Sequence, residues 1–99
     1  MLCVLRHRIT GEIACGFRRN SYDLEYYGAL WWEDKEAAEQ ESAEQLALSG
    51  HEHDSDWEIV EVGEERLKLF NVKVNNDKNR HIVLERDGKI SIRKDIAPL

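Results

Sequence analysis

Cysteine is scarce in this 99-residue sequence, which contains only Cys3 and Cys15. Two cysteines are too few for a disulfide framework, and their spacing matches neither a CxxC redox motif nor a zinc ribbon. We therefore expect both thiols to be reduced and buried.

Long apolar runs are also absent from the sequence. No run approaches the roughly 18 residues that a membrane-spanning helix requires. The start, MLCVLRHRIT, lacks the basic and continuously apolar regions of a secretion signal, and it alternates in the manner of a β-strand. The sequence therefore predicts a cytoplasmic protein that does not interact with a membrane.

The motifs of common catalytic and nucleotide-binding sites are missing. No serine lies in a GxSxG motif, and the glycines are scattered, so neither a P-loop nor a dinucleotide-binding fingerprint is present. A Cys15–His7 dyad would lie on the apolar face of a predicted strand pair, where a cysteine is usually a small buried hydrophobic residue. We expect a non-catalytic protein with no cofactor and no small-molecule site.

Charge is distributed unevenly along the chain, although the net charge is only -6. Residues 1–22 carry four arginines and one glutamate, a net charge of +3. Residues 23–66 carry fifteen acids and two bases, a net charge of -13, and residues 67–99 carry eight bases and four acids, a net charge of +4. The length allows one domain, over residues 1–99, that is basic at both ends and acidic in the middle.

The first segment, residues 2–19, has the alternation of a β-hairpin. Its apolar residues fall on odd positions: Cys3, Leu5, Ile9, Ile13, Cys15 and Phe17. If the two strands share one apolar face, paired residues must sum to an even number. A three-residue loop that ends at Gly11 satisfies this condition and pairs Arg8 with Glu12.

The C-terminal segment HIVLERDGKISIRK has the same alternation. A two-residue turn at Asp87–Gly88 would place its apolar residues on opposite faces. A three-residue loop that ends at Gly88 pairs Glu85 with Lys89 and gathers the apolar residues on one face. Those residues are Ile82, Leu84, Ile90 and Ile92. We predict the three-residue loop.

Residues 34–49 are predicted to form an α-helix, with Asp34 as the N-cap and Gly50 as the residue that ends it. One side is lined mostly by small residues: Ala38, Ser42, Ala43, Leu46 and Ala47. Such a face indicates a helix that lies close to a sheet.

The remaining apolar segments are predicted to be strands. These segments are residues 22–32, with a bulge near Gly28, residues 56–62, and residues 66–74, for which a helical turn over 64–70 is the alternative. The predicted fold class is α+β: an antiparallel sheet of N- and C-terminal hairpins plus central strands, with the single helix on one face.

The stretch HEHDSD at residues 51–56 is rich in metal-ligating side chains. His51 and His53, together with Asp54 or Asp56, form a mixed set of ligands that suits zinc or another transition metal. A polar loop between a helix and a strand explains the same residues. A metal-dependent activity at His51 and His53 is therefore only an alternative hypothesis, and we predict no metal site.

Arginines on the predicted N-terminal hairpin raise the alternative of nucleic-acid binding. Arg6 and Arg8 project from the outward face of one strand, and Arg18 and Arg19 lie at the end of its partner. Such a stripe can neutralise phosphates, but the acidic middle of the chain would repel a polyanion.

The doublet Trp31–Trp32 suggests a protein interface. Adjacent residues of an extended chain point to opposite faces, so a helix on one face leaves the other indole exposed. The leading hypothesis is a protein-interaction or regulatory module that binds a protein partner, or a second copy of itself as a homodimer, through an open sheet face. The expected contact residues are Arg6, Arg8, Arg18, Trp31 and Trp32.

Overall fold

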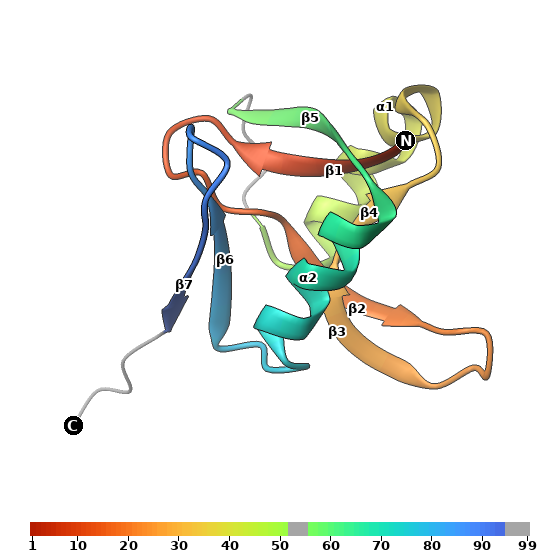
Figure 1. The fold of residues 1–99 in the computed structure, drawn as a ribbon. Helices are drawn as coiled ribbons and strands as arrows, with labels where there is room; N and C mark the ends of the chain where they lie inside the picture. Colours follow the sequence, from red (N-terminus) through yellow and green to blue (C-terminus); the bar gives the residue numbers. More distant parts are fainter. Residues whose placement is uncertain (52–55, 95–99) are drawn as a thin grey trace.

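The computed structural model describes residues 1–51 and 56–94 and shows an α+β fold in which all strands pair in antiparallel fashion (Figure 1). The elements, in order, are β1 (Leu2–His7), β2 (Cys15–Arg19), β3 (Glu25–Ala29), β4 (Trp31–Trp32), α1 (Lys35–Leu48), β5 (Trp57–Val62), α2 (Glu64–Val74), β6 (Arg80–Leu84) and β7 (Ile90–Lys94). The predicted fold class is correct, but the predicted arrangement of one sheet and one helix is wrong.

Three small sheets replace the predicted single sheet. The largest has the order β4–β1–β5, and the others are the pairs β2–β3 and β6–β7. Two isolated bridges involve the segment between β1 and β2. Ile13 of this segment pairs with Arg6 of β1, and Glu12 pairs with Val83 of β6. The three sheets are thus linked through the segment 11–14.

The segment 64–74 is the helix α2, where the sequence predicted a strand over 66–74 and, as the alternative, a helical turn over 64–70. Leu67, Phe70 and Val74 are its buried residues, and their spacing of three and four places them on one side of a helix. The helix ends at Asn75, which adopts the left-handed conformation. The strand prediction failed because the alternation in RLKL, a run of four residues, is too short to distinguish a strand from a helix.

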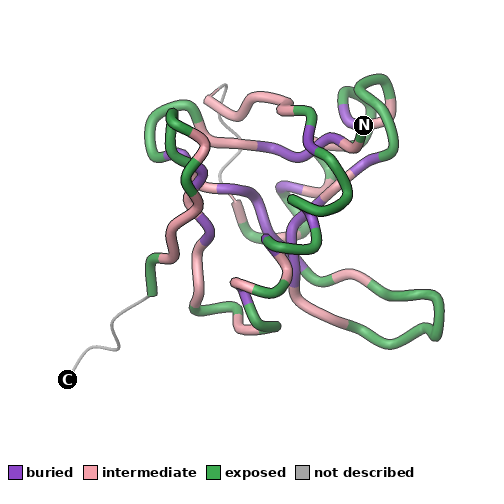
Figure 2. Tube along the Cα trace, viewed as in Figure 1, coloured by how far each residue is buried: buried purple, intermediate pink, exposed green. Residues whose placement is uncertain are grey.

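The two helices lie on opposite faces of the central sheet. Cys3 and Leu5 of β1 belong to a core cluster with Ala38 and Leu46 of α1. Val4 points the other way and belongs to a second cluster that includes residues of α2, β6 and the root of the β2–β3 pair. Figure 2 shows buried residues along β1, whereas the far end of β2–β3 is exposed. The predicted open sheet face is therefore covered.

The first hairpin has a different register from the predicted one. Gly11 is left-handed as expected, with φ 78°, but Arg6 pairs with Ile13 and the loop spans four residues. Arg8 donates its backbone N–H to the carbonyl of Asp56 instead of pairing with Glu12. The predicted register assumed that β1 has a single apolar face. This assumption failed because β1 is buried on both faces, so both its odd and its even positions are apolar.

The second hairpin confirms the predicted register. Ile82 pairs with Ile92 and Leu84 with Ile90. The Glu85 N–H donates to the Lys89 carbonyl at 2.8 Å across a loop that ends at left-handed Gly88.

The ends of α1 are also as predicted. The Asp34 carboxylate accepts the Ala37 N–H at 2.8 Å, and Gly50 follows the last turn with φ 77°. Ala38 and Leu46 are buried, whereas Ala43 and Ala47 are exposed, so the helix covers the sheet with a narrower face than predicted. Within the described ranges, neither helix is long and apolar enough to cross a membrane.

Candidate functional site

The pair β2–β3 forms a two-stranded ribbon that extends beyond the core (Figure 1). Its register runs from Cys15 opposite Ala29, which are both buried, to Arg19 opposite Glu25. Phe17, Tyr22 and Leu24 are exposed large hydrophobic side chains within this short stretch. The ribbon therefore presents apolar surface to solvent on a projecting element.

One edge of the ribbon is closed by side chains of α2 and of the residues after it. Asn71 Oδ1 accepts the Ala29 N–H at 3.0 Å, and Asn76 Oδ1 accepts the Tyr27 N–H at 2.6 Å. A Cβ atom on Gly28 would lie 2.6 Å from Asn71 Oδ1, so glycine is needed for this close approach. The two amides replace a neighbouring strand along β3.

The other edge of the ribbon runs along β2, and beyond its first residue no hydrogen-bond partner is found for it among the described residues. The Tyr27 and Ala29 N–H groups point away from β2, so the opposite residues, Phe17 and Cys15, direct their backbone groups away from β3. The Cys15 carbonyl accepts a hydrogen bond from His51 Nε2 at 2.8 Å. In the part of the chain that the structure describes, no such bond is found for the Phe17 backbone groups.

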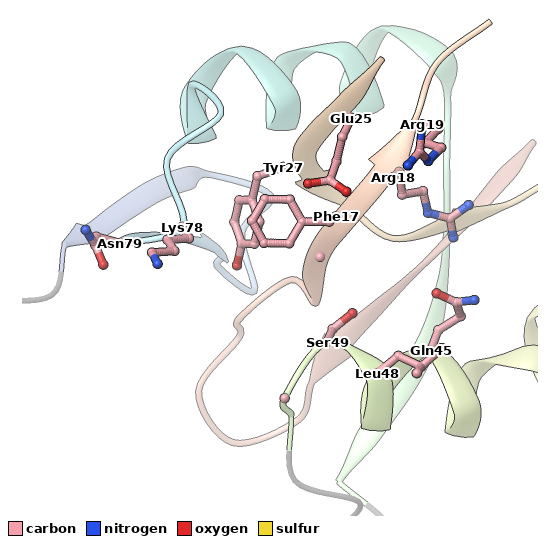
Figure 3. Close-up of a pocket in the computed structure, with 12 residues that line it drawn as sticks. Phe17, Arg18, Arg19, Glu25, Tyr27, Gln45, Leu48, Ser49, Lys78 and Asn79 are labelled. Atoms are coloured by element: carbon pink, nitrogen blue, oxygen red, sulfur yellow. The ribbon is translucent and has the colours of Figure 1, made fainter. Parts of the chain in front are cut away.

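An open groove of about 890 Å³ follows this edge (Figure 3). Gln45, Leu48 and Ser49 at the end of α1 lie on one side, and Lys78 and Asn79 lie on the other. The Phe17 and Tyr27 rings pack edge to face between them, with centroids 5.2 Å apart. Phe17 is 58% exposed and Leu48 73% exposed, so both offer contact area to a ligand.

The groove is predominantly positive in charge. Among the described residues, Arg18, Arg19 and Lys78 line it together with one acid, Glu25. Arg19 forms an exposed ion pair with Asp23 at 3.2 Å. Such a pair is screened by solvent and holds the guanidinium weakly.

Of the predicted contact residues, the structure brings Arg18, Trp31 and Trp32 together. Arg18 donates to the Trp31 carbonyl at 2.9 Å, and its guanidinium carbon lies 5.9 and 5.5 Å from the Trp31 and Trp32 ring centres. Burial lowers the pKa of Arg18, and its Nε atom has no hydrogen-bond partner among the described residues. Trp32 is only 5% exposed and Trp31 is half-buried, so the indoles mainly support Arg18.

Arg6 and Arg8 lie in a different place, at the end of β1. Arg6 donates to the Leu84 carbonyl at 2.8 Å and pairs with Glu58 at 3.2 Å. Arg8 approaches the same carboxylate at 3.6 Å. Arg6 thus joins β1 to β5 and β6, and neither arginine lines the groove.

The loop that the alternative metal-binding hypothesis rests on is described only in part. His51 Nε2 donates to a backbone carbonyl, so this nitrogen carries a proton and is not free to bind a metal in this arrangement. His53 and Asp54 lie outside the described residues. Among residues 1–51 and 56–94, no group of three or more potential ligands is arranged to hold a metal ion.

The two thiols are buried in separate core clusters. Burial and the nearby Glu12 carboxylate raise the pKa of Cys15 to about 12, and burial also raises the pKa of Cys3. Because thiolate is the reactive form, we expect both cysteines to react with a disulfide reagent such as dithionitrobenzoate only after unfolding. The rates measured at mildly alkaline pH, with and without guanidinium chloride, check this. Rapid labelling of the folded protein, assigned with Cys3→Ser and Cys15→Ser variants, would contradict it.

The sequence predictions did not identify Phe17 and Leu48 as exposed residues that line the groove. Phe17 was placed on the apolar face of the hairpin, but the chain leaves the core after Gly16. Leu48 does not belong to the small-residue face predicted for the helix, and this was a usable signal of exposure.

Comparisons with protein-family models, with curated proteins and with solved structures give no match for this chain.

Proposed function

We propose that the protein is a non-catalytic binding module that recognises a segment of another protein in the groove along β2. The observation that carries this proposal is that exposed Phe17 and exposed Leu48 line the same groove, next to a strand edge for which no partner is found among the described residues. Exposed apolar side chains that line a groove are typical of interaction sites.

The composition of the groove supports a protein ligand. Aromatic and arginine side chains contribute most of the binding energy in many protein interfaces. Here Phe17, Tyr27 and Arg18 lie within one groove, and its backbone edge offers hydrogen bonds. Of the five predicted contact residues, Arg18 is the one that lines the groove. Its hydrogen bond to the Trp31 carbonyl fixes its position.

A randomised peptide library displayed on phage tests the proposal. We expect the protein to enrich peptides whose binding is reduced at least about tenfold by Phe17→Asp or Leu48→Asp, because each change places a charge in the apolar part of the groove. Affinities of synthetic peptides, measured by fluorescence anisotropy, give the comparison.

Val72→Asp is the matched control. Val72 lies on α2, is 70% exposed, and does not line the groove. Its substitution is expected to leave peptide affinity unchanged. Failure to enrich any peptide, or equal sensitivity to all three substitutions, would contradict the proposed function.

A further inference from the structure

Building on the proposed function, we propose that the groove binds an extended acidic segment of a partner protein, which joins β2 as the third strand of the ribbon. Strand addition of this kind derives affinity from backbone hydrogen bonds and specificity from alternate side chains. Three properties of the groove lead to this proposal: its open edge, its two walls and its charge.

In the described part of the chain, the open edge of the ribbon lies along β2. The edge of β3 is occupied by the amides of Asn71 and Asn76, at 3.0 and 2.6 Å from its N–H groups. The corresponding groups of Phe17 on β2 face the groove. An unpaired strand edge is a template for another strand, and β2 provides such an edge beside a cavity.

The walls suit the alternating side chains of a strand. A residue opposite Phe17 directs its side chain to the same face as the Phe17 and Tyr27 rings. Its neighbours direct their side chains to the other face, where Leu48 and Gln45 of α1 line the groove. Apolar side chains fit both sets of contacts.

The charge of the groove selects the partner. Among the described residues, Arg18, Arg19 and Lys78 line the groove with one acid, Glu25. Of these cations, Arg18 has its guanidinium against the Trp31 and Trp32 rings. A carboxylate opposite Arg19 would form a cross-strand pair with it. A second copy of this chain is disfavoured because two adjoining β2 strands would bring together four arginines, two from each CGFRR segment.

Amide hydrogen exchange, followed by NMR, tests strand addition directly. The probe is an enriched peptide from the library selection, and we expect acidic residues to be over-represented among such peptides. Saturation with the peptide should slow exchange of the Phe17 N–H by at least about tenfold, because it becomes hydrogen-bonded. The Tyr27 and Ala29 N–H groups, already bonded to asparagine side chains, serve as internal controls and should not change.

A pair of substitutions at one position separates the backbone from the side chain. Phe17→Ala removes the ring and keeps the N–H, whereas Phe17→Pro removes both. Proline is tolerated where a strand edge faces solvent, and circular dichroism verifies that each variant folds. We expect Phe17→Pro to weaken peptide binding about tenfold more than Phe17→Ala. If the proline variant does not fold, a peptide N-methylated at successive positions provides the same comparison.

The outcomes distinguish this inference from the proposed function. If peptides bind through Phe17 and Leu48 but the Phe17 N–H exchanges as fast as before, strand addition is wrong and the binding module remains. If the enriched peptides are basic, or if the protein dimerises through β2 in sedimentation experiments, the acidic partner is wrong. Loss of any dependence on the groove overturns both.

Discussion

Phe70→Ala is expected to lower the free energy of unfolding by about 3–5 kcal/mol. Phe70 is fully buried on α2, in the core cluster that contains Val4 of β1 and Ile82 of β6. Truncation removes a large apolar side chain and leaves a cavity that these neighbours fill only in part. For a domain of this size the loss is a large fraction of the total stability, and urea denaturation measures it.

Leu69→Ala is the control for this prediction. Leu69 is the neighbour of Phe70 in sequence but is 42% exposed, because it faces away from the buried side of α2. Its truncation is expected to cost less than about 1 kcal/mol. Equal losses for the two substitutions would argue that the segment is not the helix described here.

Asn71→Leu is expected to lower the free energy of unfolding by about 1–3 kcal/mol. Leucine has a similar size but offers no acceptor, so the N–H of fully buried Ala29 loses its partner at 3.0 Å. An unsatisfied buried donor costs more than the net value of the hydrogen bond itself. Thermal and urea unfolding measure the loss.

Asn71→Asp keeps an oxygen acceptor at the same position and is the matched control. It is expected to retain most of the stability, apart from a small penalty for a negative charge in the last turns of a helix. A loss as large as that of the leucine variant would show that packing around Asn71, and not acceptance of the Ala29 N–H, determines its contribution. Exchange of the Ala29 N–H, expected to accelerate in Asn71→Leu alone, separates the two causes.

The sequence predicts the elements whose signals are local. Asp34 and Gly50 define the ends of α1 because capping depends on a few neighbouring residues. The register of β6–β7 follows from Gly88 and from one apolar face. In each case the information lies within one turn or one hairpin.

Other parts of the fold depend on tertiary contacts. The alternation of Leu67 and Leu69 suggested a strand, but burial of Leu67 and Phe70 against β1 and β6 determines that α2 is a helix. To predict the register of the first hairpin, one must know that Val4 and Leu5 are both buried, on opposite faces of β1. A sequence pattern cannot supply this, because both faces read as apolar.

The candidate site was only partly predictable, for a related reason. The sequence identified arginine and aromatic residues, and Arg18 does line the groove. However, the predicted exposure of one tryptophan rested on an open sheet face, and α2 covers that face. Exposure of Phe17 depends on where the ribbon leaves the core, which is set by contacts between residues far apart in the chain.

The central position of β1 affects how the chain folds during synthesis. β1 emerges from the ribosome before every element that covers it, since its edge partner β5 ends at Val62 and its second cover, α2, ends at Val74. Until β5 and α2 have been synthesised, the apolar side chains of β1 cannot be buried against them. Contacts between residues far apart in sequence also form slowly. The sheet around β1 is therefore expected to be completed and covered only after the residues up to Val74 have emerged from the ribosome.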